Sequence, residues 1–392
     1  METPNRPRVL VVIDTLGPGG AEESMKAMLP LVRTFGVDVE VGILRSIAPE
    51  REEALRERGV PVTDIGPAVG PVGVAKALRR AIRERQPDLL HVTLFDPVVG
   101  GAVIGRLTGT PVLASIVNTP PDTGANAPKD TAGSRWKVRA LRHVEAFVCR
   151  HLVTQVHAVT PGVRDAVIDR FGVRADRVTV SPRGRDPKRF HPASAEERAE
   201  ARAVFDLADG DEVVVALARH EPSKGLVDLA DAAAVLRERR PAAKVLIGGR
   251  DGSQTEALVD RIRTHGLGGT VVLLGDRPDP ERILAAADLF VLASRREGTS
   301  GATIEAMAAG LPIVATDVSG LTGITVDDVN AVIVPIAQPD RLGEAMADLL
   351  DDPDAARRLG AGALETFRTQ FDLEQAARSM AEMYQRAAAK DR

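Results

Sequence analysis

Short apolar runs rich in β-branched residues alternate with longer amphipathic stretches along most of the chain. We predict six strands in the first half, at 8–14, 37–44, 88–94, 111–117, 155–160 and 177–182. Helical patterns separate several of them, for example over 21–35 and 74–86. Strands that alternate with helices across short Gly/Pro turns indicate βαβ units, and therefore a parallel sheet with helices on both faces.

The same pattern starts again in the second half. Five more strands are predicted, at 211–218, 243–249, 270–275, 287–294 and 312–317. The stretch 183–205 between the two sets is polar and contains prolines before it turns helical, which is typical of a connection between domains. We therefore predict an α/β fold of two Rossmann-like, doubly wound parallel-sheet domains facing a cleft, where ligands of such sheets bind.

The domain boundaries follow from this restart. Residues 1–190 are assigned to an N-terminal Rossmann-like domain and residues 191–371 to a C-terminal one. The last segment, 372–392, has a helical pattern. It is predicted to pack on either domain, so the chain could cross back to the N-terminal one. The length of 392 residues fits two domains, because single cores stop growing beyond about 250–300 residues.

Composition narrows the function classes. The chain is 44% hydrophobic and 27% charged, with a net charge of −4 and 3% aromatic residues, so nothing favours disorder or nucleic-acid binding. The one cysteine, Cys149, excludes an intrachain disulfide, and no Cys/His spacing resembles a zinc site. The early apolar run, Val9 to Ile13, is too short for a signal peptide or a membrane span. We expect a buried strand there and a cytoplasmic protein.

A glycine-rich turn, LGPGGAEES, follows the first predicted strand and opens a helix. Its glycines let the backbone approach a ligand, and the helix N-terminus attracts anions. The dinucleotide fingerprint fails, because its third glycine would fall at Glu22, although Glu40 has the spacing of a ribose ligand. The alternative is a tight turn that contacts no ligand.

Two cations follow the first strand of the second half. Arg219 and Lys224 stand in RHEPSKG, on a loop at the carboxyl end of that strand. An arginine can grip two oxygens while a lysine acts as a point charge, and together they suit a diphosphate. The alternative is a pair of solvated loop charges.

Two glutamates bracket a loop of small residues in REGTSGATIEAMAAG. Glu297 precedes the loop, and Glu305 lies about two turns into the following helix. A carboxylate can accept two hydrogen bonds from neighbouring hydroxyls, so sugar or ribose hydroxyls are natural partners. Nothing nearby completes a carboxylate-rich metal shell, so no metal is expected.

Together these motifs resemble the retaining glycosyltransferases of family 4, which have the GT-B architecture. The resemblance covers nearly the whole chain in order: GPGGAE near the start, RGRDPKRFHP at the domain junction, R-x4-K-G in RHEPSKG and E-x7-E in REGTSGATIE. Each motif alone is weak, whereas the ordered set is specific.

The resemblance implies roles for individual residues. Arg219 and Lys224 would neutralise the diphosphate of a nucleotide-sugar donor, Glu297 would hold the donor sugar, and Glu305 would bind the ribose. The backbone over Gly298, Thr299, Ser300 and Gly301 would contact the sugar, and Gly19 and Gly20 would approach the donor from the other domain. The segment 275–284 resembles the loop that reads the nucleobase. Such enzymes need neither cofactor nor metal, and the nucleotide sugar is their co-substrate.

The sequence also departs from the family pattern. Where many relatives have a histidine near the reacting centre, this chain has Asn118, which can donate a hydrogen bond but cannot act as a general base. His91 could substitute, or it is a structural histidine of a buried strand. At the junction, Arg183 and Arg185 occupy positions that are often Asn and Val in relatives. They would meet an anionic acceptor or face solvent.

The stretch 128–151 is basic and contains Trp136. Its charges are Lys129, Arg135, Lys137, Arg139, Arg142 and Arg150 against Asp130 and Glu145. It is a candidate for peripheral contact with anionic lipid or a phosphorylated acceptor. The alternative is the solvated face of a helix.

We therefore predict a metal-independent retaining hexosyltransferase that uses a nucleoside-diphosphate sugar, with a UDP-sugar favoured. Glu297, Arg219, Lys224, Asn118 and His91 are its candidate catalytic residues. The acceptor is unknown and is a small metabolite, a glycan or a lipid-linked molecule. The alternatives are a sugar-nucleotide epimerase, a phosphorylase, or a non-catalytic protein that senses nucleotide sugars.

Overall fold

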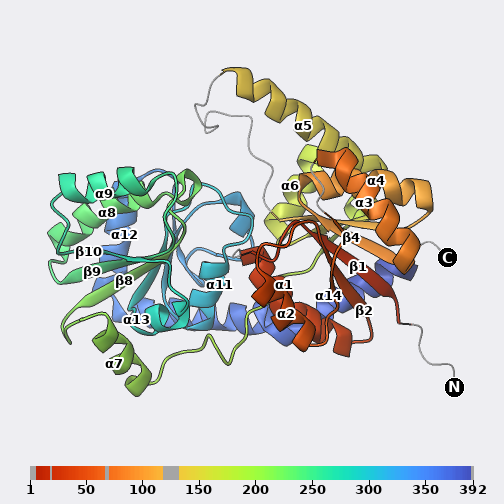
Figure 1. Cartoon of the computed structure of the whole chain (residues 1–392). Coiled ribbons are helices and arrows are strands. Elements are labelled where there is room, and N and C mark those ends of the chain that lie inside the picture. The colour runs from red at the N-terminus through yellow and green to blue at the C-terminus, as the bar shows by residue number, and fades with distance from the viewer. Residues whose placement is uncertain (1–5, 18–19, 67–69, 118–131, 390–392) are drawn as a thin grey trace. The chain divides into compact units, whose positions relative to one another are not determined.

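The computed structural model describes residues 6–17, 20–66, 70–117 and 132–389. The chain divides into two compact units (Figure 1). Unit 1 comprises residues 1–184 and 373–392, and unit 2 comprises residues 185–372. The chain therefore passes from unit 1 into unit 2 and returns for its last helix. The sequence-based boundaries were 1–190, 191–371 and 372–392.

Unit 1 contains a seven-stranded sheet in the order β3-β2-β1-β4-β5-β6-β7, and all its pairings are parallel. Val9 of β1 pairs with Val39 of β2 on one side and with Leu89 of β4 on the other. The strands are β1 (Arg8–Ile13), β2 (Asp38–Ile43), β3 (Val62–Asp64), β4 (Leu89–Thr93), β5 (Val112–Ile116), β6 (Gln155–Ala158) and β7 (Val178–Val180).

Helices connect these strands in the right order for βαβ units. They are α1 (Gly20–Thr34), α2 (Pro49–Glu57), α3 (Gly70–Arg85), α4 (Phe95–Thr108), α5 (Ala132–His151), α6 (Pro161–Phe171) and, from the end of the chain, α14 (Leu373–Ala389).

Both faces of the unit 1 sheet are buried, because successive strand residues point to opposite faces. Along β1, Leu10 and Val12 belong to the core beneath α3 and α4. Val9 and Val11 belong to the opposite core, which also contains Met28 of α1. This two-sided burial explains why β1 reads as an unbroken apolar run.

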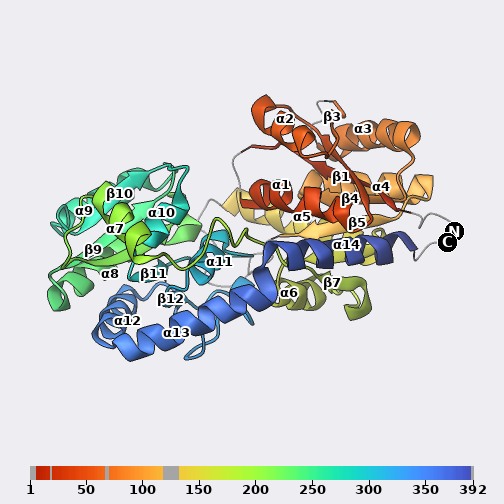
Figure 2. The same cartoon turned by 90° about the horizontal axis from the view of Figure 1, so that it is seen from below.

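The last helix, α14, completes the second of these cores (Figure 2). Its buried face contributes Ala377, Met380, Met383 and Tyr384, which pack with the apolar residues of α1 and β1. Gln385 Nε2 also donates a hydrogen bond to Phe35 O at 3.0 Å. Residues 373–389 are thus part of the core of unit 1, although about 190 residues of unit 2 precede them in the chain.

Unit 2 contains a six-stranded parallel sheet in the order β10-β9-β8-β11-β12-β13. The strands are β8 (Glu212–Leu217), β9 (Ala243–Gly248), β10 (Val271–Gly275), β11 (Leu289–Leu292), β12 (Ile313–Thr316) and β13 (Val332–Val334). The helices are α7 (Ala195–Val204), α8 (Leu226–Arg239), α9 (Thr255–Thr264), α10 (Pro280–Ala285), α11 (Gly301–Ala308), α12 (Pro339–Asp351) and α13 (Pro353–Thr366).

The predicted fold class is confirmed: each unit is a doubly wound parallel α/β sheet. Two strands were missed, β3 and β13, and both are three-residue edge strands. β7 is equally short and also lies at a sheet edge, yet it was predicted within the run 177–182, so length alone does not explain the two misses. No helix within the described residues is long and apolar enough to cross a membrane.

The packing of α14 generates a prediction. Ending the chain after Asp372 would expose the apolar surface of α1 and the edge of the unit 1 core, so we expect unit 1 to unfold at a temperature at least about 10 °C lower. Differential scanning calorimetry measures this change. Ending the chain after Ala389 removes only three residues and is the matched control. An unchanged transition in the longer truncation would contradict the assignment of α14 to this core.

Candidate functional site

The unit 2 sheet brings predicted side chains together at the carboxyl ends of β8 and β11. These strands are neighbours, and the strand order changes direction between them: β9 lies on the other side of β8, and β12 on the other side of β11. Ligands of doubly wound sheets bind at such a point. Arg219 and Lys224 follow β8, and Glu297 follows β11.

Glu297 is a buried carboxylate whose Oε1 accepts hydrogen bonds from a cation and a hydroxyl. Its side chain is 6% exposed. Lys224 Nζ donates to Glu297 Oε1 at 2.7 Å, and Ser294 Oγ donates to the same oxygen at 2.7 Å. Hydrogen bonds from a cation and a hydroxyl offset the cost of removing a carboxylate from water. The carboxylate is therefore fixed at the edge of the sheet.

The loop after β8 lies directly against the end of β11. Gly225 has a φ of +63°, and a Cβ atom there would lie 2.0 Å from the carbonyl oxygen of Ala293. Ser223 O also accepts a hydrogen bond from Arg295 N at 2.8 Å. Only glycine satisfies both the backbone conformation and the close approach at position 225. This glycine is therefore what allows Lys224 to reach Glu297.

The two predicted cations differ in environment. Lys224 is engaged with Glu297, whereas Arg219 is exposed and its side chain has no ion pair within the described part of the chain. The exposed guanidinium of Arg219 is therefore available to an anionic ligand. Sequence reasoning identified both residues but did not predict that Lys224 pairs with Glu297.

The loop between the two glutamates leads into α11. Ser300 caps the helix, because its Oγ accepts a hydrogen bond from Thr303 N at 3.2 Å. Thr299 Oγ1 is buried and has no hydrogen-bond partner in the described structure. A buried hydroxyl without a partner costs about 1–3 kcal/mol, which a ligand hydroxyl or phosphate oxygen could recover.

Glu305 has a partner that the sequence analysis did not assign. Arg185 Nε donates to Glu305 Oε1 at 2.6 Å, and both side chains are largely buried. The solvent-facing alternative for Arg185 is therefore wrong: its charge is neutralised within unit 2. The departure from the apolar residue found at this position in relatives was the available signal, but the partner lies 120 residues away.

The structure describes only part of the site that was predicted in unit 1. Gly19 and Asn118 lie outside the described residues. Gly20 is the first residue of α1, as predicted for a turn that opens a helix. Arg51 Nη1 donates a hydrogen bond to Gly17 O at 3.2 Å.

A backbone feature at the end of β4 was not foreseen. Leu94 has a φ of +74° and is exposed, directly beyond β4, which neighbours β1 where the order of the first sheet changes direction. A bulky residue with positive φ is uncommon and is strained by about 1–3 kcal/mol. No sequence pattern reports such a conformation.

His91 belongs to a buried chain of hydrogen bonds. Tyr384 Oη of α14 bonds to His91 Nδ1 at 2.7 Å, and His91 Nε2 bonds to Ser115 Oγ at 2.6 Å. Ser115 Oγ bonds to His157 Nδ1 at 2.6 Å, and His157 Nε2 bonds to Ser181 O at 2.8 Å. The chain crosses β4, β5 and β6 and attaches α14 to the sheet.

The last acceptor fixes the direction of the whole chain. A backbone carbonyl can only accept, so His157 Nε2 carries a proton and Nδ1 accepts from Ser115. His91 Nε2 then donates to Ser115, and Tyr384 donates to His91 Nδ1. Burial lowers the pKa of His91 well below its ordinary value, and burial lowers the pKa of His157 to about 4. Both rings are therefore neutral near pH 7.

This arrangement favours the structural alternative for His91. Its side chain is buried, and both ring nitrogens are engaged in hydrogen bonds inside unit 1. A general base needs a nitrogen that reaches the substrate.

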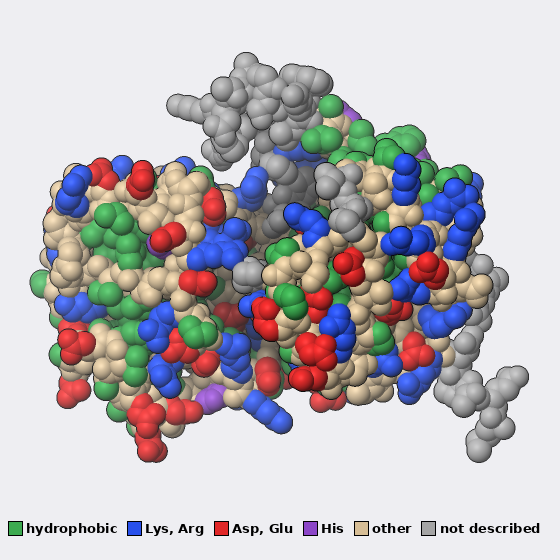
Figure 3. Space-filling view, in the orientation of Figure 1, with side chains coloured by type: hydrophobic (Ala, Val, Ile, Leu, Met, Phe, Trp, Pro, Cys, Tyr) green, Lys and Arg blue, Asp and Glu red, His purple; other side chains and the backbone are tan. Residues whose placement is uncertain are grey.

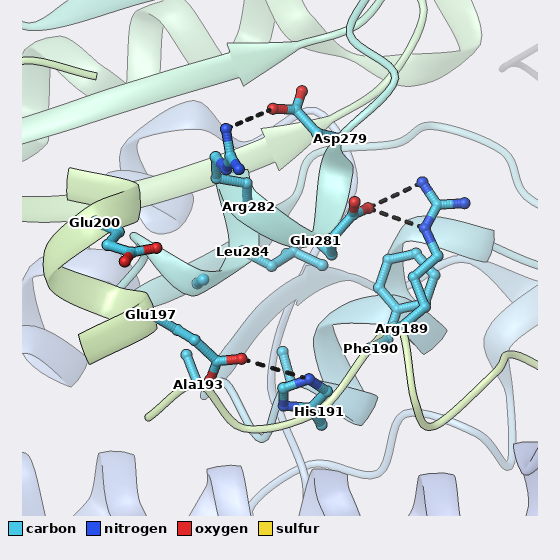
Figure 4. Close-up of a pocket in the computed structure, with 12 residues that line it drawn as sticks. Arg189, Phe190, His191, Ala193, Glu197, Glu200, Asp279, Glu281, Arg282 and Leu284 are labelled. Atoms are coloured by element: carbon cyan, nitrogen blue, oxygen red, sulfur yellow. Dashed lines mark hydrogen bonds and ion pairs between the residues drawn. The ribbon is translucent and has the colours of Figure 1, made fainter. Parts of the chain in front are cut away.

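The structure also has a cavity of about 210 Å³ in unit 2, on another part of that unit (Figure 4). Arg189 pairs with Glu281 at its rim, and His191 faces Glu197. Arg219, Lys224, Glu297 and Glu305 do not line it, whereas Asp279, Glu281, Arg282 and Leu284 of the segment 275–284 do. Arg282 also lies within ion-pair distance of Asp279 in this cavity.

Comparison with family models gives two matches. The model described as "Glycosyl transferase 4-like domain" matches residues 19–184, and the model described as "Glycosyl transferases group 1" matches residues 197–366. Together they cover most of both units, in the same order along the chain.

Curated relatives match over different lengths. A D-inositol 3-phosphate glycosyltransferase from Nocardia farcinica is 36% identical over 50% of this chain and 44% of its own length. A mannosylfructose-phosphate synthase from Agrobacterium fabrum is 36% identical over 42% of this chain and 38% of its own. The chain thus matches less than half the length of these two relatives. A D-inositol 3-phosphate glycosyltransferase from Paenarthrobacter aurescens is 25% identical over 87% of both chains.

Solved structures share the fold. The Anabaena protein HepE in complex with UDP-glucose superposes with a TM-score of 0.82 at 22% identity, covering 97% of this chain and 100% of HepE. WaaG, a glycosyltransferase involved in lipopolysaccharide biosynthesis, has a TM-score of 0.74 at 16% identity, covering 96% of this chain and 99% of WaaG.

The buried histidines generate a prediction about pH. Their pKa values are lower in the folded state, so between about pH 6.5 and pH 4 the unfolded chain binds protons that the folded chain does not. The free energy of unfolding should therefore fall as the pH falls through this range, by about 1.4 kcal/mol per pH unit for each histidine. Urea unfolding of unit 1 at several pH values measures it.

Two histidine variants isolate this effect from the carboxylates. His157→Gln, whose amide can still donate to Ser181 O, should flatten the dependence, whereas His143→Gln on the exposed surface of α5 should leave it unchanged. Equal slopes for both variants would show that the buried chain does not cause the dependence.

Proposed function

Because this chain belongs to the group 1 glycosyl transferases and has their GT-B fold of two Rossmann-like domains, we propose that it is a retaining glycosyltransferase. It transfers a hexose from a nucleoside-diphosphate sugar to an acceptor hydroxyl. The observation that carries this proposal is the cluster of Lys224, Glu297 and Ser294 at the point where the unit 2 strand order changes direction.

Unit 2 is the donor-binding unit in this proposal. Arg219 and Lys224 neutralise the diphosphate, because both cations belong to the segment that follows β8 and the guanidinium is exposed. Glu297 accepts hydrogen bonds from the donor sugar, and Glu305 accepts them from the ribose. Gly298, Thr299, Ser300 and Gly301 line the path between the two glutamates, and the buried Thr299 hydroxyl finds its partner there.

The chemistry follows from charge placement. The bond between the anomeric carbon and the diphosphate oxygen breaks as the acceptor oxygen attacks from the same face, and a phosphate oxygen takes the acceptor proton. Configuration is therefore retained without a protein base. Cationic side chains that lie beside the leaving diphosphate stabilise the charge that develops on it.

Unit 1 binds the acceptor in this proposal, and Gly19, Gly20 and Asn118 contribute to the donor sugar from that unit. A uridine nucleotide is favoured, because HepE, with the same fold over the whole chain, binds UDP-glucose. The acceptor is a small metabolite, a glycan or a lipid-linked molecule. The curated relatives include enzymes named for inositol phosphate and for a sugar phosphate.

We further propose that the protein is cytoplasmic and touches membranes through α5. Leu141, Val144 and Phe147 are exposed on this helix, and they recur at the spacing of one helical face. Apolar side chains gather over the part of unit 1 where α4 and α5 lie (Figure 3). The sequence of α5 has six Lys, Arg or His residues in the fifteen positions that follow Trp136, which would attract an anionic surface.

The donor is tested by thermal unfolding with a panel of UDP-, GDP- and ADP-sugars. A ligand present at about 100 times its dissociation constant stabilises unit 2 by about 2.7 kcal/mol, which raises its unfolding temperature. Lys224→Met should weaken binding at least about tenfold, since it removes a charge-assisted contact. Lys244→Met removes a lysine bound only to Gly269 O and should bind normally.

Turnover separates the proposal from its alternatives. Release of nucleoside diphosphate with acceptor glycosylation supports the transferase. Conversion of the sugar without acceptor would indicate an epimerase, and binding without turnover would indicate a sensor. If Lys224→Met binds the nucleotide sugar as tightly as the wild-type protein does, the assignment of the site is wrong.

Membrane contact is tested by sedimentation with vesicles that contain phosphatidylglycerol. The triple variant Leu141→Ser, Val144→Ser, Phe147→Ser should bind at least about tenfold more weakly, because it removes three exposed apolar side chains. The control replaces Val259, Val272 and Val326, three exposed valines of unit 2, with serine. Equal binding of both variants would contradict a role for α5.

A further inference from the structure

Arg185 is an arginine with an unusual environment. Its side chain is 10% exposed, and its Nε donates to Glu305 Oε1 at 2.6 Å. A buried guanidinium is costly unless a carboxylate neutralises it. A buried ion pair often adds no net stability, so we expect another role for the pair of Arg185 and Glu305.

Arg185 lies where the chain enters unit 2, and its backbone is bonded to the segment where the chain leaves unit 2. Arg185 is the first residue of unit 2, and its N–H donates to Phe371 O at 2.9 Å. A parallel bridge also joins Arg185 to Asp372, the last residue of unit 2. The side chain therefore starts from a fixed position.

The guanidinium lies against the first residue of α11. A Cβ atom on Gly301 would lie 2.2 Å from Arg185 Nη2, so the absence of a side chain at 301 makes room for the arginine. A positive charge beside a helix N-terminus is unfavourable with respect to the helix dipole. Arg185 therefore does not serve to stabilise α11, and its pairing with Glu305 is the interaction that offsets this repulsion.

The contact leaves one carboxylate oxygen of Glu305 available. Arg185 binds Oε1, and no hydrogen bond to Oε2 occurs among the described residues. A carboxylate has two oxygens, and each can accept. Fixing one of them by a charge-assisted hydrogen bond orients the other.

We propose that Arg185 is a positioning residue that orients Glu305 toward the ribose hydroxyls of the bound nucleotide. This inference rests on the proposed function, which assigns the ribose to Glu305. Arg185 does not touch the nucleotide. It acts through the carboxylate, and its effect is confined to recognition of the ribose.

Recognition of the 2′-hydroxyl is the readout that isolates this role. Isothermal titration calorimetry measures the dissociation constants of UDP, dUDP, GDP and dGDP. The comparison then uses whichever of UDP and GDP binds more tightly, together with its 2′-deoxy form. Wild-type protein should prefer ribose over 2′-deoxyribose by at least about tenfold, the value of one charge-assisted hydrogen bond. In Arg185→Gln and in Glu305→Gln, the ribose and deoxyribose forms should bind with nearly equal dissociation constants. The double variant should behave like either single variant.

Arg198→Gln is the matched control. Arg198 forms an ion pair of 2.6 Å with Asp288 within the same unit, away from the strand ends that carry Glu297 and Lys224. This variant should keep the wild-type ribose preference. If Arg185→Gln does not fold, Arg185→Lys provides the comparison, because lysine has no Nε–H fork to orient a carboxylate and should also reduce the preference.

The outcomes are distinguishable. An equal loss of affinity for ribose and deoxyribose forms in Arg185→Gln would mean that the guanidinium contacts the phosphates, and would overturn the positioning role. An unchanged preference would overturn it as well. Wild-type protein that binds none of these nucleotides and none of the UDP-, GDP- and ADP-sugars would refute the proposed function itself, and the inference with it.

Discussion

The strand order of the unit 2 sheet is the constraint on which the candidate site depends. Since all strands run parallel, their carboxyl ends share one edge, and the loops after β8 and β11 meet because the order changes direction there. Lys224 and Glu297 are 73 residues apart in sequence, yet their side chains form a hydrogen bond of 2.7 Å. Without the glycine at position 225, the first loop could not lie close enough to the end of β11 for this contact.

Unit 1 shows the same dependence of polar contacts on sheet order. Ser115 is the register partner of His157, and His91 is the partner of Leu113, two residues before Ser115. Three neighbouring strands therefore contribute to one line of hydrogen bonds. Tyr384 joins this line from the far end of the chain. These polar groups can be buried because each of them has a hydrogen-bond partner. The bond from Tyr384 to His91 also fixes the position of α14 on the sheet.

The long strands and the overall architecture could be predicted from the sequence, because buried parallel strands produce continuous apolar runs. The three-residue edge strands β3 and β13 were missed, whereas β7, which is equally short and also at an edge, was predicted within the run 177–182. Glu297, Lys224 and Arg219 were identified from their motifs, but their separate environments were not. The pairing of Arg185 with Glu305 spans 120 residues, and only the folded sheet and the return of the chain at Asp372 bring them together.

The bridge between Arg185 and Asp372 has a topological consequence. Unit 2 is a guest inserted into a host, and its two ends are adjacent, joined by the hydrogen bond from Arg185 N to Phe371 O. Domains whose ends lie together can be inserted or exchanged with little disturbance of the host. The segment 185–372 carries Arg219, Lys224, Glu297 and Glu305, the side chains that we propose for the diphosphate, the sugar and the ribose. The contribution of unit 2 to donor recognition therefore resides in one contiguous stretch of chain whose two ends are adjacent in space.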